Sequence, residues 1–150
     1  MSNKPLGNLG SSVGDLDQRW SIGQCATLAC LLEVTASKPG NVHRGCDFED
    51  MTFLDFAVSA TAIGPVMDAA PDVGVGATVL RAVRATRQWV TVNTNLGSVL
   101  LIAPLACVPT DQPLATGVVE VLEELTPEDA EQVYQAIRLA QPGGLGRTEQ

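Results

Sequence analysis

"CATLACLLEVTA", Cys25 to Ala36, and "FLDFAVSATAIGPVM", Phe53 to Met67, are two apolar runs on either side of "SKPGNVHRGCDFEDM", Ser37 to Met51. Apolar residues recur in both runs at three- and four-residue spacing, which is the period of an α-helix with one buried face. The Pro-Gly pair in the middle stretch ends the first helix. The pattern therefore predicts two helices joined by a loop that is rich in ionisable side chains.

The helical period continues along the chain, and no alternation typical of β-strands appears. The expected helices cover residues 17–36, 50–70, 73–89, 96–108, 114–125 and 127–140. The last of these has the clearest start, with Thr126 as N-cap, Pro127 at the first helical position and Asp129 three residues after the cap. A Gly-Pro pair at residues 64–65 is expected to kink or break the second helix.

Two helices have a stripe that we expect to face the core. On the first helix the stripe consists of Ile22, Cys25, Ala29, Leu32 and Ala36, and on the second it consists of Phe53, Phe56, Ala60 and Ile63. We predict an all-α, single-domain bundle of about six helices, with residues 1–16 as a flexible leader and residues 17–150 as the domain. Because the chain ends in a Gly-rich loop, "QPGGLG", we interpret it as the amino-terminal part of a larger helical fold.

The composition excludes several classes of protein. The chain has 150 residues, of which 45% are hydrophobic and 4% aromatic, and its formal net charge is -8. A surface of this charge repels polyanions, so we expect no nucleic-acid partner. The longest apolar run is shorter than the roughly 20 residues that a membrane span needs. The four cysteines form no C-x-x-C pair, and we expect Cys25, Cys30 and Cys107 to be buried free thiols in a cytoplasmic protein.

The loop between the first two helices carries the features of a phosphate site. Lys38 and Arg44 supply positive charge, and the side chain of Asn41 adds a hydrogen-bond donor. Gly40 allows backbone N–H groups to approach an anion closely. His43 can donate to a phosphate or exchange a proton near neutral pH. An ordinary charged turn remains the alternative.

Carboxylates near the loop suggest a magnesium site. Asp47 and Asp50 are three residues apart at a helix start, where they can point to the same side. Such ligands suit Mg²⁺ bound to nucleotide phosphates, although acids also favour helix N-termini through the macrodipole. Glu33 is expected close to the apolar face of the first helix, as a metal ligand or general base. Pairing with an arginine is the alternative for Glu33.

Two further polar groups stand out. Asn93, Thr94 and Asn95 precede an apolar helix, where they either cap it or face a phosphate at its positive end. Arg81, Arg84 and Arg87 form a stripe opposite Val79, Leu80 and Val83. We interpret this stripe as a solvated face, with anion binding as the alternative.

Four motifs together resemble the triphosphoribosyl-dephospho-CoA synthase family. They are "EVTASKPGNVHR", "DFEDMTFLDFAVSA", "NTNLGSVLLIAPLA" and "PGGLG", which occur in the family's order between about Cys25 and Gly146. The resemblance implies an all-helical, cytoplasmic, ATP-dependent transferase. It would move a triphosphoribosyl group from ATP to 3'-dephospho-CoA and release adenine, with Mg²⁺ on the triphosphate. The product is a prosthetic-group precursor.

The resemblance carries over residue by residue. The matching positions are Glu33, Lys38, Pro39, Gly40, Val42, Arg44, Asp50, Met51, Ser59, Asn93, Thr94 and Gly97. Together with the loop chemistry, this gives Glu33, His43 and Asp50 as candidate catalytic residues and Glu33, Asp47 and Asp50 as candidate metal ligands. The candidate ATP- and phosphate-binding residues are Lys38, Gly40, Asn41, Arg44, Asn93, Thr94, Asn95 and Gly97.

The chain also departs from the family pattern. Citrate-type members tend to have Asp in place of His43, His in place of Phe48, and His-Lys in place of Asn95-Leu96, and they are roughly twice as long. Two other functions therefore stay open. One is a related nucleotide-using enzyme with a different acceptor, as in one-carbon or pterin cofactor synthesis. The other is an inactive fragment that acts as a binding or assembly partner. A homodimer is also left open.

Overall fold

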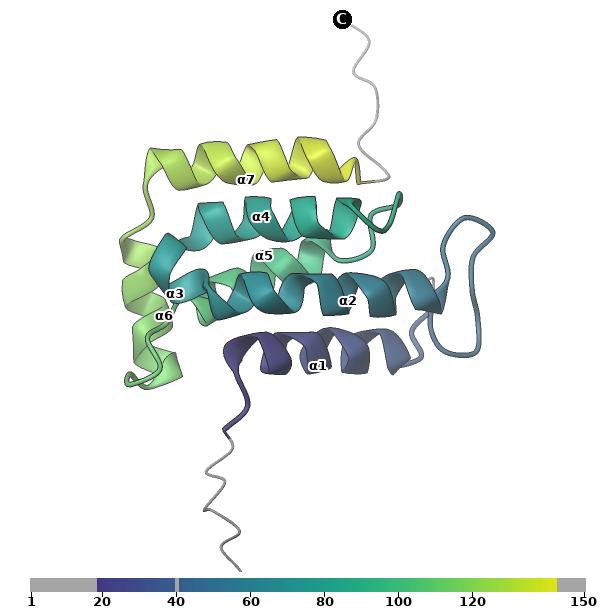
Figure 1. Ribbon diagram of the computed structural model, residues 1–150, viewed down its shortest axis with the longest axis horizontal. Coiled ribbons are helices and arrows are strands. Elements are labelled where there is room, and N and C mark those ends of the chain that lie inside the picture. The colour runs from purple at the N-terminus through teal and green to yellow at the C-terminus, as the bar shows by residue number, and fades with distance from the viewer. Residues whose placement is uncertain (1–18, 40, 143–150) are drawn as a thin grey trace, which may run out of the picture.

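A computed structural model describes residues 19–39 and 41–142. The expected leader, Gly40 and most of the "PGGLG" motif lie outside the described residues. Within them the fold is all-α, as predicted, and has seven helices (Figure 1). The helices are α1 (Ile22–Thr35), α2 (Phe53–Asp68), α3 (Ala70–Val73), α4 (Val75–Arg87), α5 (Leu96–Ala106), α6 (Leu114–Glu123) and α7 (Pro127–Ala140).

Four of the helices lie side by side in the order α1, α2, α4, α7, and α5 lies behind them (Figure 1). The loop between α1 and α2, the connector from α4 to α5 and the end of α7 all lie at the same end of the bundle. The short helices α3 and α6 lie at the opposite end. Segments far apart in sequence are therefore brought together at the loop end.

Capping residues decide where three of the helices begin. The N-cap and N3 residues of these capping boxes are Ser21 and Gln24 in α1, Thr52 and Asp55 in α2, and Thr126 and Asp129 in α7. In each box the two side chains accept hydrogen bonds from each other's backbone N–H groups. The expected start of α7 is confirmed, whereas α1 begins at Ile22 rather than near residue 17 and α2 at Phe53 rather than near residue 50.

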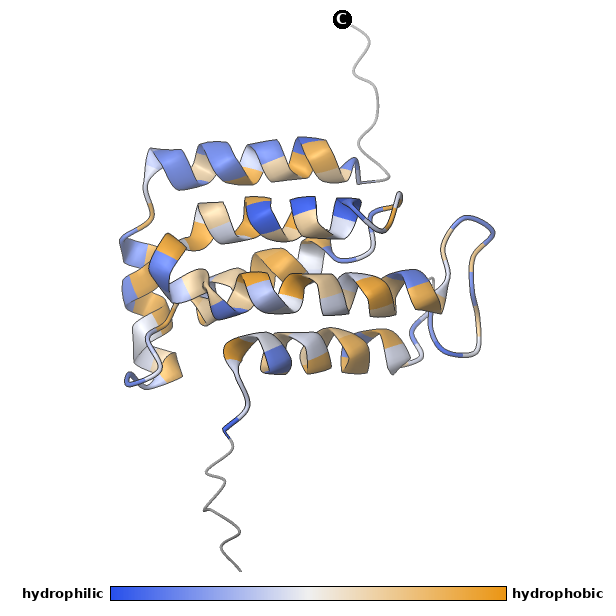
Figure 2. Cartoon of the chain, viewed as in Figure 1, coloured by the Kyte–Doolittle hydropathy of each residue, from blue (hydrophilic) through white to orange (hydrophobic). Residues whose placement is uncertain are grey.

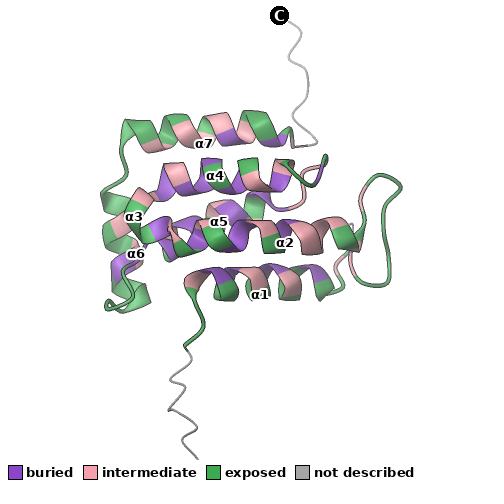
Figure 3. Cartoon of the chain, viewed as in Figure 1, coloured by how far each residue is buried: buried purple, intermediate pink, exposed green. Residues whose placement is uncertain are grey.

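The buried face of α1 differs from the predicted stripe. Its buried residues are Gly23, Ala26, Cys30 and Val34. Cys25 and Leu32, both in the predicted stripe, are exposed. Buried, intermediate and exposed parts alternate along α1 in Figure 3. Apolar residues are not confined to one side of the helix, and orange, white and blue alternate on the side seen in Figure 2, so the period alone does not identify the inner side. Packing decides it, since a Cβ on Gly23 would lie 2.1 Å from the carbonyl oxygen of Gly64.

Helix α2 continues through Pro65 and ends at Asp68, so the Gly-Pro pair does not break it. The chain turns a few residues later, where Pro71 occupies the first turn of α3. The predicted inner face of α2 is correct for Ala60 and Ile63, which are buried, but Phe53 and Phe56 are only half-buried. Both phenylalanines lie near the loop end of α2, where the bundle is open.

The core consists mainly of alanine and valine side chains from α2, α4 and α5, as the low aromatic content predicts. Cys30 and Cys107 are buried as expected, but Cys25 is exposed, as is Cys46. The arginine stripe on α4 is opposite a buried face, and Arg81 and Arg84 are exposed. No helix in the described part of the chain is both long and apolar enough to span a membrane.

Candidate functional site

A cavity of about 470 Å³ lies at the loop end of the bundle. Its wall comes from four separate segments: the end of α1, the loop, α2, and the connector with the first turns of α5. The lining residues are Glu33, Asn41, Phe48, Met51, Phe56, Asn93, Thr94, Asn95, Gly97, Ser98 and Leu101. The structure therefore brings together six of the predicted site residues, from two of the four sequence motifs, and a third motif adds Phe48, Met51 and Phe56 to the wall.

Asn93 and Asn95 hold the connector in place by different hydrogen bonds. The Oδ1 atom of Asn93 accepts the backbone N–H of Leu96, 3.2 Å away, which leaves the two N–H donors of its amide for another partner. Asn95 is buried, and its Nδ2 donates to Oγ1 of Thr86 at 3.1 Å. Asn93 thus caps α5 and keeps donors available, whereas Asn95 mainly fixes the connector to α4.

The Thr94 hydroxyl has a defined direction of donation. Ser59 Oγ donates to the backbone carbonyl of Asp55 at 2.7 Å, and it lies 2.6 Å from Thr94 Oγ1. A hydroxyl has one proton, so Thr94 is the donor in the second bond. The lone pairs of Thr94 then remain as acceptors at the cavity wall. Such an atom suits a ribose hydroxyl better than a phosphate oxygen.

The amino-terminal turn of α5 contributes backbone donors. Gly97 and Ser98 are its second and third residues, where N–H groups have no acceptor within the helix. A Cβ built on Gly97 would have no atom within 4 Å, so the space beside this backbone is open. The positive end of the helix dipole lies at the same place. This side of the cavity is electrostatically suited to an anion.

Glu33 and Lys38 form an ion pair beside the cavity. Their side chains are 43% and 38% exposed, so the pair lies in water rather than in the core and contributes little to stability. This corrects the expectation that Glu33 lies against the apolar face, and its partner is a lysine rather than an arginine. Burial, followed by the charge of Glu33, raises the pKa of the Cys30 thiol.

Five described residues that were predicted for the loop site do not line this cavity, namely Lys38, His43, Arg44, Asp47 and Asp50. His43 accepts the N–H of Gly45 at Nδ1, and its backbone pairs with that of Cys46. Asp47 Oδ1 accepts the backbone N–H of Phe53 at 2.6 Å and so ties the loop to the start of α2. Arg44 is exposed. Local hydrogen bonding thus accounts for His43 and Asp47 in this structure.

Asp50 lies in a second, adjoining cavity of about 270 Å³. This cavity is lined by Asp50, Met51, Arg87, Thr91, Val92, Asn93, Ala140 and Gln141. Met51 and Asn93 belong to both walls, so the two cavities lie on either side of these residues. Within the described residues no group of three acidic, histidine or cysteine side chains is placed to hold a metal ion. The predicted set of Glu33, Asp47 and Asp50 is therefore not assembled.

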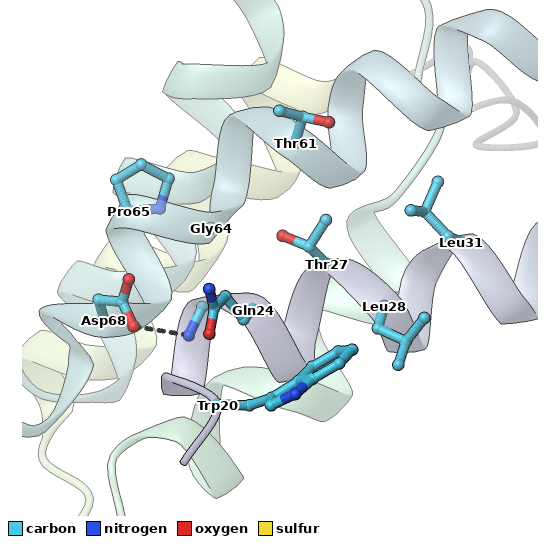
Figure 4. A pocket seen from close by; sticks show the side chains of 10 residues that line it. Trp20, Gln24, Thr27, Leu28, Leu31, Thr61, Gly64, Pro65 and Asp68 are labelled. Carbon is cyan, nitrogen blue, oxygen red and sulfur yellow. Dashed lines mark hydrogen bonds between the residues drawn. The ribbon is translucent and has the colours of Figure 1, made fainter. Parts of the chain in front are cut away.

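A larger hollow of about 570 Å³ lies elsewhere, between α1 and α2 (Figure 4). Most of its wall is apolar, and its one acidic group, Asp68, is engaged, because Oδ1 accepts the N–H of Gly23 at 2.7 Å. None of the predicted site residues lines it. It lacks the combination of donors and carboxylates found at the loop end.

Sequence reasoning missed two groups of lining residues. Ser98 has a signal in the sequence, because it is the third residue of a helix that the Asn-Thr-Asn triplet introduces. Phe48, Phe56 and Leu101 form an apolar wall, which only the tertiary arrangement places beside the polar residues. Arg87 was singled out only as part of a stripe, and nothing in the sequence separates it from Arg84.

The fold and the cavity define a helical-bundle domain with one mixed polar and apolar site at its loop end. A family model described as ATP:dephospho-CoA triphosphoribosyl transferase (CitG) matches residues 19–150, and the chain belongs to this family. The family resemblance seen in the sequence is thereby confirmed, and the class of activity at family level is that of a transferase. No curated protein and no solved structure matches the chain.

Proposed function

We propose that this chain binds ATP at the loop-end cavity and transfers its triphosphoribosyl group to 3'-dephospho-CoA or a related acceptor, with release of adenine. The observation that carries the proposal is the single cavity that gathers Glu33, Asn41, Asn93, Thr94 and Gly97 from distant parts of a chain of this family. Its wall carries both donors, in the amide of Asn93 and the backbone of Gly97, and acceptors, in Thr94 and Glu33, as a nucleotide with a negative triphosphate and a neutral ribose needs.

The donor and acceptor groups on the cavity wall suggest how ATP is oriented. The free N–H groups of Gly97 and Ser98, with the amide of Asn93, are suited to bind phosphate oxygens. The Thr94 lone pairs and the Glu33 carboxylate are suited to accept hydrogen bonds from ribose hydroxyls. The apolar wall leaves space for an adenine ring beside the polar groups.

The reaction replaces one bond at C1' of the ribose by another. The bond from C1' to the adenine nitrogen breaks, and an acceptor hydroxyl oxygen forms a new bond to C1'. The proton of that hydroxyl passes to a base, and adenine leaves with a proton, so the overall charge balances. Glu33 is the carboxylate at this cavity and is the proposed base, and its ion pair with Lys38 holds the carboxylate beside the cavity.

The available residues suit a magnesium ion that is held by one carboxylate and by the substrate phosphates. Mg²⁺ usually takes one or two carboxylates and completes its coordination with water and substrate phosphates. Asp50 has no hydrogen bond or ion pair to any described residue and lines a cavity, so its oxygens are available. Bound there, Mg²⁺ would neutralise part of the triphosphate charge.

An adenine-release assay tests the proposal. The protein is incubated with ATP, Mg²⁺ and 3'-dephospho-CoA, and free adenine and modified acceptor are separated by chromatography. We expect both products, and we expect Glu33→Gln to lower the rate by about a hundredfold or more if Glu33 is the base. Glu131→Gln on the exposed face of α7 is the matched control. Absence of adenine with every acceptor would reject the transferase.

A different acceptor is the second candidate, and one observation favours it. At the positions where citrate-type relatives carry His-Lys, this chain has Asn95 and Leu96, which are both buried. Neither of them presents a charge to the acceptor. Adenine release without modification of dephospho-CoA would support an acceptor of the one-carbon or pterin type.

A further inference from the structure

We infer that Arg87 binds the terminal phosphates of the nucleotide in the second cavity, across Asn93 from the ribose. This inference rests on the proposed function and extends it, because it assigns a binding residue and a direction to the triphosphate. The guanidinium of Arg87 and the carboxylate of Asp50 line this cavity together.

Arg87 is the only arginine of the α4 stripe that lines a described cavity. It is half-buried, whereas Arg81 and Arg84 are exposed. Its Nη1 donates to the backbone carbonyl of Thr91. Arg84 lies in the same last helical turn, so attraction to the helix end does not by itself explain why Arg87 turns into the cavity wall.

The guanidinium keeps most of its donors. It has five N–H groups, and the bond to Thr91 uses one of its nitrogens. Among the described residues, no carboxylate forms an ion pair with it, although Asp50 lines the same cavity. A planar guanidinium with free donors suits bidentate binding of a phosphate.

Asp50 and Arg87 together suit a magnesium-bound phosphate better than a bare anion. The carboxylate offers an oxygen to the metal and the guanidinium offers donors to the phosphate, so neither charge is left unpaired. Asn93, whose amide donors are free, belongs to the walls of both cavities. A triphosphate that begins at the α5 N-terminus can therefore pass Asn93 and end between Asp50 and Arg87.

The test compares ATP with adenosine, both in the presence of Mg²⁺, by isothermal titration of the full chain. In the wild type we expect ATP to bind more tightly than adenosine. In Arg87→Gln we expect the ATP affinity to fall about tenfold or more, as for loss of a charged hydrogen bond, with adenosine affinity unchanged. Arg84→Gln, with the same charge change three residues earlier, should leave both affinities unchanged.

A second variant and the melting temperatures distinguish a loss of phosphate binding from a loss of folding. Arg87→Lys retains the charge and should restore part of the ATP affinity, and all variants should melt close to the wild type. Equal effects of Arg87→Gln and Arg84→Gln, or an equal loss for ATP and adenosine, would overturn the assignment of Arg87. If the wild type binds neither ligand, the nucleotide site itself is rejected, which is a distinct result.

Discussion

The hydroxyl oxygens of Ser59 and Thr94 lie 2.6 Å apart and join the middle of α2 to the connector that carries the candidate site. Ser59 is fully buried, and its hydroxyl donates a hydrogen bond to the backbone carbonyl of Asp55. The position of the connector therefore depends on the packing of α2. The hydrogen bond to Ser59 also determines which atoms of Thr94 are available to a ligand.

Substitution of this pair should show coupling. We expect Ser59→Ala and Thr94→Val to interact by about 0.5–1.5 kcal/mol in a double-mutant cycle measured by urea unfolding, because each removes the same hydrogen bond. Thr94→Val should also weaken adenosine binding, since it removes the acceptor. Thr61→Val, at an exposed threonine of α2, is the control. Strictly additive effects would show that the bond does not form in solution.

Gly97→Ala should separate stability from ligand binding. A methyl group there meets no atom within 4 Å and favours the helix, so we expect unfolding free energy to rise by up to about 1 kcal/mol. The same methyl would occupy the space beside the phosphate-facing N–H groups and should weaken Mg-ATP binding. Gly117→Ala should instead destabilise, because its Cβ would lie 2.4 Å from Val108 Cγ1. Unchanged ATP affinity in Gly97→Ala would move the phosphates away from α5.

Asp129 should make stability depend on acid pH. Burial raises its pKa, but hydrogen bonds from Thr126 and Gly76 outweigh burial and leave the pKa below its ordinary value of 3.8. A carboxyl with a lowered pKa stabilises the fold fully above its unfolded value, and this contribution is lost as pH falls through the folded value. Asp129→Ala should therefore cost about 1–3 kcal/mol at pH 7 and progressively less below about pH 4.

Urea unfolding from pH 7 down to pH 2.5 measures this difference. Glu128→Ala is the control, because Glu128 lies in the same turn of α7 but accepts no bond from a backbone N–H. A stability difference that stays constant across the whole pH range would exclude the ionised carboxylate as its source.

The four cysteines should react at two different rates. Cys25 and Cys46 are exposed, while burial raises the pKa of the thiols of Cys30 and Cys107. The thiolate is the reactive form, so two thiols should react rapidly with a disulfide reagent at pH 8 and two slowly. In denatured protein, all four thiols should react rapidly. A Cys25→Ser, Cys46→Ser double variant that still reacts rapidly would contradict the arrangement of α1.

Local signals in the sequence were sufficient for some parts of the fold. The start of α7 was predicted correctly, because a capping box depends on residues close together in the chain. The inner face of α1 was not, because a helix that is apolar on most sides is oriented by the contact of Gly23 with Gly64, 41 residues away in the chain.

In the candidate site, too, some residues could be predicted from local motifs and others depend on contacts between distant parts of the chain. The motifs pointed to Glu33, Asn93 and Thr94, which the cavity does gather. The sequence could not indicate that Asp47 is engaged with the backbone of α2, or that Arg87, unlike Arg81 and Arg84, lines the same cavity as Asp50. These relations depend on how the loop and the end of α4 are placed by the rest of the bundle.

The bond between Gly23 and Asp68 has a consequence for how the site opens. It fixes α1 to α2 at the end remote from the loop, and the close glycine contact adjoins it (Figure 4). The 14 residues of α1 extend about 21 Å from that point. A rotation of 3° about it therefore moves the loop end by about 1 Å. A small pivot at the contact of Gly23 with Gly64 would therefore shift Glu33, near the other end of α1, relative to the connector that carries Asn93.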